Sequence, residues 1–244
     1  MNIFLSLGST YPARIPFAAM DLGVNANDPV LGKISNGHVQ LCPQNGPMKI
    51  TQEVLADLQS KWPETKFRLH ANARLLDKPV LFDLGTIEHF PEYRKALVKT
   101  LRYLGEGYSI HAASGKNAPV ALKQIERCQQ LEQDSGVPVG IEGLYPGVTG
   151  VFSTWADYAL LLENDVRFAV DLSHLNIVRD KEGQAPEGLV EDLLGHPNCI
   201  EVHVSGNNGL RDSHESVEEG TWWLAVMDKI NPNAVIFYEG RQRQ

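Results

Sequence analysis

The sequence has few cysteines, no long apolar run and no excess of positive charge. Its three cysteines, Cys42, Cys128 and Cys199, are odd in number and far apart, so they fit neither a disulfide framework nor a paired-cysteine zinc site. Such sparse use of cysteine is typical of a reducing compartment. No apolar stretch approaches the roughly 18 residues that a membrane span needs, and the N-terminal segment MNIFLSLGST lacks the basic region of a signal peptide. We therefore expect a cytoplasmic protein without a membrane partner.

Basic residues are outnumbered: 22 Lys and Arg stand against 30 Asp and Glu among 244 residues, which gives a net charge of −8. This balance disfavours a general binder of nucleic acid, although a local basic groove would be compatible with it. The chain also lacks low-complexity segments, repeats of fixed period and the glycine-rich phosphate fingerprint of many open sheets. With 43% hydrophobic residues it can bury a large core, and we expect residues 1–244 to form a single domain.

Short β-forming runs recur along the chain and alternate with amphipathic helical patterns. Strands are predicted at Asn2–Leu7, His38–Leu41, Lys66–His70, Tyr108–His111, Val137–Glu142, Val166–Asp171, Cys199–Val204 and Ala234–Glu239. Helices are predicted at Thr51–Trp62, Glu92–Leu104, Pro119–Leu131, Trp155–Leu162, Pro186–Leu194 and Thr221–Ile230. Eight strands alternating with helices predict an α/β protein, a (β/α)8 TIM barrel with a parallel eight-stranded sheet, and a doubly wound open sheet is the alternative. Ser9–Gly37 is expected to be a long loop with at most one short helix.

Six consecutive predicted strands end on histidine, aspartate or glutamate, and the loop after the seventh strand adds two more such residues. The full set is His70, His111, Glu142, Asp171, His174, His203, Asp212, His214 and Glu239. Because the C-terminal strand ends of a barrel meet at one mouth, these nine side chains are expected on one rim. Asp171 and His174 are three residues apart at the start of a helix, and Asp212 and His214 are two apart in an extended loop, so each pair can face the same side.

A set of histidines and carboxylates without thiolates favours Zn, Mn or Fe. Zinc takes about four ligands and six-coordinate metals about six, so nine ligands predict two or three divalent ions with shared carboxylates. Zinc is the favoured ion, with Mn and Fe as alternatives. Taken singly, a strand-end histidine is more often structural, and Asp171 or Asp212 could be a helix cap or turn former. Five of the eight histidines occupy these positions, which favours a metal site; His38, His89 and His196 do not fit the pattern and are expected to be structural or exposed.

The ordered ligand series resembles that of endonuclease IV, in AP endonuclease family 2, and therefore the wider xylose-isomerase-like TIM-barrel superfamily. The resemblance implies three zinc ions that cleave a phosphodiester at an abasic site. The segment IEVHVSGNNGLRDSH also resembles the EIHLAG…D-x-H segment of multinuclear non-haem iron oxidases that modify peptides. Sugar isomerases and epimerases of the superfamily use a smaller set, usually with one Mn or Mg, which matches Glu142, Asp171, His203 and Glu239.

The chain departs from each of these families at particular positions. Endonuclease IV has HPGS where this chain reads HAAS from His111, and ENTAG where this chain reads EGLY from Glu142. Many of the oxidases have asparagine at the position of His174. Compared with the smaller ligand set of the isomerases, this chain has additional ligands that would have no role in isomerisation: His70, His111, Asp212 and His214.

The same side chains support three reactions, and the fold alone does not select one. In hydrolysis, Glu142 would bridge two ions; in isomerisation, Glu142 and Glu239 would be the catalytic acid and base; oxidation would use an open iron site. The complete ligand set favours metal-assisted hydrolysis of a phosphate ester. A sugar or sugar-phosphate isomerase or epimerase is the alternative, an iron oxidase acting on a peptide is a further one, and a non-catalytic binding role is the fourth.

The net charge and the short loops favour a small substrate over nucleic acid, and therefore favour the isomerase alternative. The expected partner is a small-molecule or phosphoester substrate. Arg211 and Tyr145, in loops at the predicted rim, are the residues expected to contact it.

Strand alternation also places charges inside the predicted barrel. Arg68 shares the parity of His70, Arg167 that of Asp171, and Glu201 that of His203. An unpaired buried charge would be severely destabilising, so Glu201 is expected to pair inside the barrel with Arg68 or Arg167.

Overall fold

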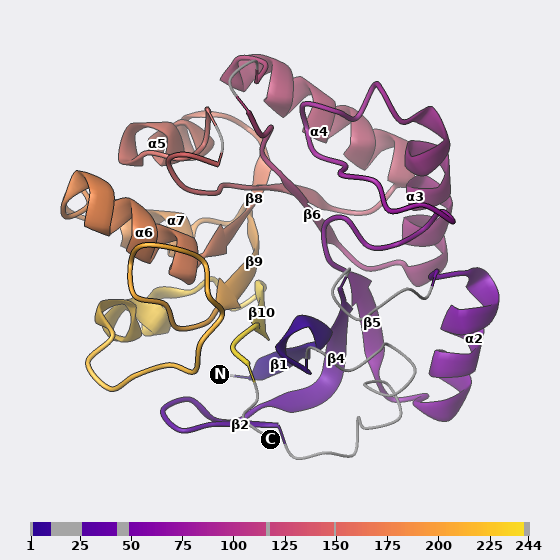
Figure 1. Ribbon diagram of the computed structural model, residues 1–244, viewed down its shortest axis with the longest axis horizontal. Coiled ribbons are helices and arrows are strands. Elements are labelled where there is room, and N and C mark those ends of the chain that lie inside the picture. Colours follow the sequence, from indigo (N-terminus) through magenta and orange to yellow (C-terminus); the bar gives the residue numbers. More distant parts are fainter. Residues whose placement is uncertain (1, 11–25, 43–48, 116–117, 149, 242–244) are drawn as a thin grey trace.

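A computed structural model describes residues 2–10, 26–42, 49–115, 118–148 and 150–241. Eight parallel strands form the central sheet: β1 Ile3–Ser6, β4 Ser35–Leu41, β5 Lys66–Leu69, β6 Tyr108–His111, β7 Val139–Glu142, β8 Arg167–Asp171, β9 Cys199–Val204 and β10 Val235–Tyr238. Within this sheet each strand pairs with the next one along the chain, except that β5 does not pair with β6, and β10 pairs with β1 (Figure 1). The two ends of the sheet, β5 and β6, also contact each other. The predicted (β/α)8 TIM barrel is therefore confirmed as a nearly closed barrel.

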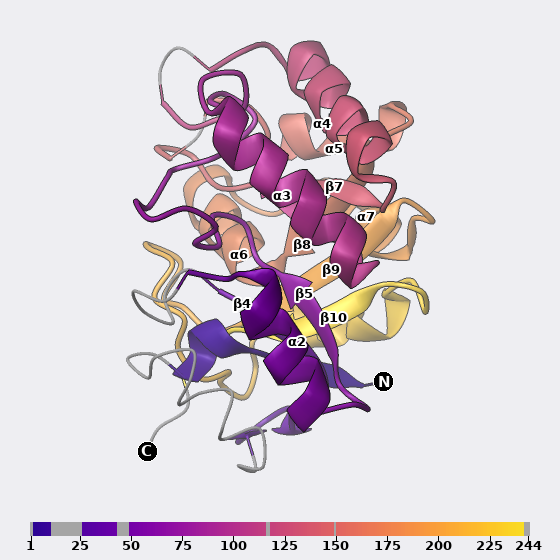
Figure 2. The same ribbon diagram turned by 90° about the vertical axis from the view of Figure 1, so that its right-hand side faces the viewer.

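The helices lie outside the strands. They are α2 Gln52–Lys61, α3 Pro91–Leu104, α4 Ala121–Ser135, α5 Trp155–Glu163, α6 Leu172–Glu182 and α7 Leu189–Gly195, with two 3-10 helices, η1 Leu7–Thr10 and η3 Trp222–Lys229. Figure 2 shows α2 and α3 on the outer side of the strands. None of the helices in the described ranges combines the length and apolarity that a membrane crossing requires.

Local sequence explains where several helices begin and end. Thr154 and Asp157 form a capping box at the start of α5, in which each side chain accepts a backbone N–H of the other residue. α3 and α4 end at Gly105 and Gly136, whose φ angles of 69° and 71° lie in the left-handed region that glycine adopts without strain.

Two helices differ from the sequence prediction. The segment predicted as a helix at Thr221–Ile230 forms the 3-10 helix η3, which has no side-chain cap at Thr221 and opens with two tryptophans of modest helix propensity. α6 begins directly after Asp171, where the sequence predicts the start of a helix without giving its range. Within the predicted loop Ser9–Gly37, a small hairpin of β2 Asn27–Asp28 and β3 Gly32–Lys33 follows η1, and residues 11–25 lie outside the described part of the chain.

The barrel interior carries the predicted ion pair. Glu201 is fully buried, Arg68 is 5% exposed, and their side chains form an ion pair, so this prediction is confirmed. The inward orientation expected for Arg167 is wrong: its half-exposed side chain pairs with Glu132 of α4. Arg167 is the first residue of β8, and from this strand end its long side chain reaches the outer helix instead of the barrel interior.

Candidate metal centre

All nine predicted ligands meet at the C-terminal ends of the strands. A chain of histidine–carboxylate contacts, none longer than 3.8 Å, connects them in the order His111, Glu142, His203, Glu239, His214, Asp212, His174 and Asp171, with His70 joined to Glu239. The residues come from the ends of six strands, from the first turn of α6, which carries His174, and from the loop after β9. The convergence that the barrel topology predicted is therefore present in the structure.

A first group of ligands consists of His70, His111 and Glu142. One ligand atom from each lies within 4.8 Å of the other two, close enough for one ion to contact all three. The Nε2 atom of His111 is 3.6 Å from Oε2 of Glu142.

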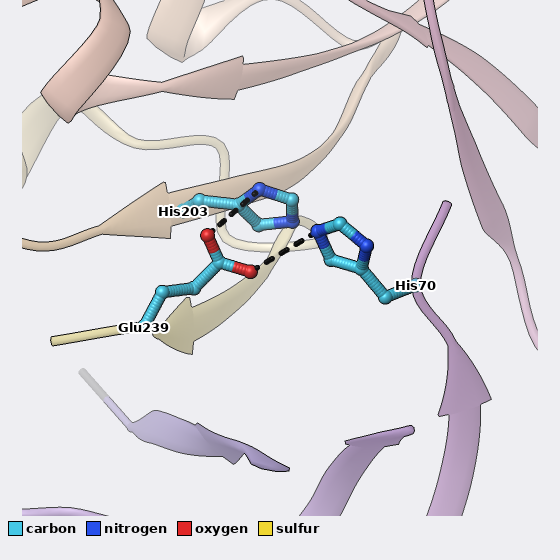
Figure 3. A group of neighbouring side chains, drawn as sticks. All are labelled: His70, His203 and Glu239. Atoms are coloured by element: carbon cyan, nitrogen blue, oxygen red, sulfur yellow. Dashed lines mark ion pairs between the residues drawn. The ribbon is translucent and has the colours of Figure 1, made fainter. Parts of the chain in front are cut away.

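A second group consists of Glu142, Asp171 and His203, whose ligand atoms also lie within 4.8 Å of one another. The Nδ1 atom of His203 is 3.3 Å from Oε1 of Glu142 and 3.8 Å from Oε2 of Glu239. The other Glu239 oxygen is 3.3 Å from Nε2 of His70, so these three side chains point toward one another from β9, β10 and the end of β5 (Figure 3). Glu142 belongs to both groups and is placed to bridge them.

A third group is formed by His174, Asp212 and His214. Oδ2 of Asp212 lies 3.4 Å from Nε2 of His174 and 3.0 Å from Nε2 of His214. The loop that carries Asp212 and His214 is closed by two backbone hydrogen bonds of 2.7 Å between Gly206 and Glu215. A Cβ at Gly206 would meet a backbone oxygen at 2.3 Å, so only glycine permits this closure.

Hydrogen bonds outside the cluster fix the direction of several rings. Nδ1 of His70 lies 2.8 Å from the carbonyl oxygen of Ala71, and Nδ1 of His174 lies 3.1 Å from that of Gly143. Since a carbonyl only accepts, these Nδ1 atoms carry protons, and Nε2 is the nitrogen that faces the carboxylates and would bind an ion once it has lost its own proton. Metal-binding histidines are held in this way by their second nitrogen.

Three polar atoms in the cluster are buried without a hydrogen-bond partner in the described part of the chain: Glu142 Oε2, His203 Nδ1 and His214 Nδ1. Buried polar atoms are almost always satisfied, and an unsatisfied one costs free energy. A divalent cation would satisfy all three, because carboxylate oxygens and neutral imidazole nitrogens are the donors that Zn, Mn and Fe accept. The residues present therefore fit a metal centre.

The pKa values within the cluster move in opposite directions. Burial would raise the pKa of Glu142, but the nearby imidazoles of His203 and His111 hold it well below its usual range. Burial also opposes a charged His174, yet Asp171 and Asp212 raise the pKa of that imidazole to about 10. By contrast, burial lowers the pKa of His111 to about 4. In the metal-free protein, protonated histidines therefore neutralise the negative charge of the buried carboxylates, as a metal cation would.

The two residues expected to contact substrate differ in their placement. The ring of Tyr145 lies 5.2 Å from that of His174, at the third group. Arg211 is exposed in the loop after β9.

The three histidines that did not fit the ligand pattern lie outside the cluster. His38 is buried between the rings of Phe4 and Phe237, His196 packs on Phe168, and His89 is exposed.

Some supporting residues were not predicted. Ser6 donates to Glu239 (3.4 Å), and Asn72 contacts Nδ1 of His111 (3.4 Å). Gln40 and Ser109 hydrogen-bond to Glu201 one layer below the rim, each at 2.9 Å. Ser109 shares the strand parity of His111, so the alternation that located Arg68 could also have located Ser109.

No family model and no curated protein matches the sequence. Solved structures are similar over nearly the whole chain. A D-tagatose 3-epimerase-like protein is 15% identical, covers 100% of this chain and 92% of its own, and has a TM-score of 0.68. A xylose isomerase domain containing protein from Salmonella typhimurium LT2 is 11% identical (98% and 90% covered, TM-score 0.69), and an AP endonuclease, family 2, from Brucella melitensis is 12% identical (100% and 95%, TM-score 0.65). At this identity the likeness shows the fold alone, a TIM barrel, and the matched structures include the xylose isomerase and AP endonuclease family 2 types that the ligand order resembles.

Proposed function

We propose that this protein is a metal-dependent enzyme whose centre holds two or three divalent ions, with zinc favoured, and that it hydrolyses a phosphate ester of a small substrate. The observation that carries the proposal is the convergence of all nine side chains, in which Asp212 contacts both His174 and His214 beside the first two ligand groups. We further propose that residues 1–244 act as one domain in the cytoplasm, in keeping with three free, buried cysteines.

When bound, ions in such a centre lower the pKa of water and stabilise charge on a phosphoryl group. Glu142 lies between His111 and His203 and would be the bridging ligand of two groups. A protein nucleophile is not needed for this chemistry, and the thiol nearest Glu239 is unsuited to it. Burial and the Glu239 carboxylate raise the pKa of Cys42 to about 12, so that thiol stays protonated at neutral pH.

Epimerisation or isomerisation of a sugar or sugar phosphate is the second candidate. The carboxylates of Glu142 and Glu239 flank Nδ1 of His203 at 3.3 and 3.8 Å, as an acid and a base around one ion would. A D-psicose 3-epimerase from Clostridium cellulolyticum H10, solved with D-tagatose, has the same fold, with 10% identity and a TM-score of 0.66. The third group has no role in that reaction, and this favours hydrolysis.

Metal stoichiometry measured together with activity tests the proposal. Protein purified without chelator, with an anaerobic duplicate, is analysed by elemental mass spectrometry and assayed on phosphomonoesters, phosphodiesters, abasic DNA and ketoses. Two or three Zn or Mn per chain with phosphoester cleavage would support hydrolysis. One Mn or Mg with ketose epimerisation would favour the second candidate, iron retained only in the anaerobic sample would favour a peptide oxidase, and no metal under any condition would overturn the metal centre.

The variant Asp212→Ala separates hydrolysis from epimerisation. It removes the carboxylate shared by His174 and His214, so a hydrolase should lose one ion per chain and roughly 100-fold in turnover. A mononuclear epimerase would keep its ion and most of its activity. His89→Ala, a change at an exposed histidine outside the cluster, is the matched control and should change neither.

A further inference from the structure

A closed polar network lies directly beneath the metal centre, inside the barrel. It joins Gln40 of β4, Arg68 of β5, Ser109 of β6 and two residues of β9, Glu201 and His203. Gln40, Ser109 and Glu201 are fully buried, and the other two are at most 5% exposed. Four strands of the barrel therefore meet at one carboxylate that water does not reach.

Each contact of the Glu201 carboxylate comes from a donor. Oε1 accepts from the Gln40 amide and the Ser109 hydroxyl, each at 2.9 Å, and Oε2 accepts from the Arg68 guanidinium. The remaining contact is Nε2 of His203, 2.6 Å from Oε1. A carboxylate beside a guanidinium is ionised and can only accept, so this nitrogen must carry a proton.

The proton on Nε2 determines which nitrogen of His203 is free to bind an ion at the metal centre. A neutral imidazole with its proton on Nε2 has its lone pair on Nδ1. In His203 this is the buried atom that lacks a hydrogen-bond partner among the described residues, and it points toward Glu142 and Glu239. His70 and His174 are held the opposite way, with Nδ1 on a backbone carbonyl.

We infer that Glu201 is a positioning residue of the metal centre, which holds the His203 proton on Nε2 so that Nδ1 is the ligand atom. This rests on the proposed metal-dependent function. Arg68 keeps the carboxylate anionic, and the anionic partner makes the imidazole a stronger ligand than a carbonyl partner would. The ion pair of Arg68 and Glu201 thus determines which nitrogen of His203 can bind an ion in the second group, although neither residue is itself a proposed ligand.

The first test reads the tautomer in the unaltered protein. The zinc-loaded chain, labelled with 15N-histidine, is examined by long-range 1H–15N correlation, and His203 is assigned by comparison with a His203→Gln variant. Observation of a protonated Nε2 and a zinc-bound Nδ1 is expected. Observation of a protonated Nδ1 would overturn the inference, and this measurement does not depend on any Glu201 variant folding.

The second test removes the charge pair as a unit, in the double variant Glu201→Gln, Arg68→Met, so that no buried charge is left unpaired. Zinc affinity should fall 10- to 100-fold while the circular dichroism spectrum stays that of the parent. The matched control is Glu132→Gln, Arg167→Met, which makes the same two changes in the pair between α4 and β8 and should leave affinity within about twofold of wild type.

Unchanged zinc affinity in the Glu201 double variant would show that the ion pair only stabilises the barrel. This result would overturn the positioning role of Glu201 but not the proposed function. If the wild-type chain binds no metal, the proposed function falls first and the positioning role falls with it.

Discussion

Nε2 of His174 lies 3.4 Å from one carboxylate oxygen of Asp171, while the other oxygen accepts backbone N–H groups of Ser173 and His174 at 2.7 and 3.3 Å. Asp171 is thus the N-cap of α6 and a member of the histidine–carboxylate cluster at once. The cap orients the carboxylate, because one oxygen is held by the helix while the other faces the centre. The two interpretations that the sequence left open for Asp171, helix cap and metal ligand, are compatible in this geometry.

Asp171→Asn and Asp171→Ala should separate these two contributions. Asparagine retains a carbonyl oxygen and caps helices as well as aspartate, whereas alanine does not. In the metal-free protein, urea unfolding should show the alanine variant about 1 kcal/mol less stable than the asparagine variant. Both variants lack the carboxylate and should lose metal by elemental mass spectrometry. Equal stability of the two variants, or full metal content in the asparagine variant, would contradict the dual role.

The strand-end pattern sufficed to locate the centre because a barrel imposes its own geometry. Once eight parallel strands are expected, residues at their C-terminal ends must meet, whatever the helices do. This is why His70, His111 and Glu142 could be placed from sequence, together with the buried partner Arg68 of Glu201. The prediction for Arg167 failed at the first residue of β8, where the side chain pairs with Glu132 of α4, and strand parity alone does not show whether a long side chain at a strand end turns outward.

The extent of helix α6 and the backbone conformation of the loop after β9 could not be predicted from sequence patterns. Five of the first seven α6 residues, LSHLNIV, are apolar or histidine in no clear 3.6-residue period, and six residues of this helix are buried, so amphipathicity gave a weak signal. The third ligand group depends on the Gly206–Glu215 closure and on a φ of 48° at His214. Such a backbone conformation is rare outside glycine and is held only by its surroundings.

Metal binding at pH 7 should release protons from particular histidines. In the metal-free chain, carboxylates overcome burial and raise the pKa of His174 to about 10 and that of His214 to about 9, so both are protonated. A ligand imidazole must be neutral, so filling the third group should release about two protons, and its affinity should rise with pH up to about pH 10, the pKa of His174. Burial lowers the pKa of His111 to about 4, so that histidine has no proton to release.

Isothermal titration calorimetry in two buffers of different ionisation enthalpy measures this proton count. His174→Ala should reduce it by about one, because a protonated histidine is lost. His111→Ala should leave the count per bound ion unchanged and serves as the control. A count that is equal in the wild type and His174→Ala would contradict the assignment of His174 as a protonated ligand.

Asp28 joins the hairpin β2–β3 to β10 and to the segment after the third ligand group. Its fully buried carboxylate accepts four hydrogen bonds, from the N–H groups of Val30, Leu31 and Val217 and from the Tyr238 hydroxyl at 2.8 Å. Asp28→Ala leaves these donors without a partner and should lower the free energy of unfolding by about 2–4 kcal/mol in urea. Asp28→Asn keeps one acceptor oxygen and should cost less; an alanine variant as stable as wild type would show that water replaces the carboxylate.

Gly107 gives Arg68 the space it needs beneath the centre. A Cβ on this buried glycine would lie 2.7 Å from Nη2 of Arg68 and 3.4 Å from the carbonyl oxygen of Pro138. The guanidinium is the flexible end of its side chain, but its ion pair with fully buried Glu201 holds it in place. Gly107→Ala should therefore destabilise the protein by about 1–3 kcal/mol in urea unfolding, the usual cost of overpacking.

The matched control for Gly107→Ala is Gly150→Ala, where the added Cβ would meet its nearest neighbour, the carbonyl oxygen of Gly115, at an ordinary 3.5 Å. That variant should lie within about 0.5 kcal/mol of wild type. Zinc affinity is a second measurement. A displaced Arg68 would weaken its ion pair with Glu201, and Glu201 would then fix the position of the His203 ring less well. Lower stability together with lower zinc affinity in Gly107→Ala is the expected pattern. Lower stability with unchanged affinity would mean that Arg68 moves without disturbing Glu201, and the ion pair would then matter to the barrel alone.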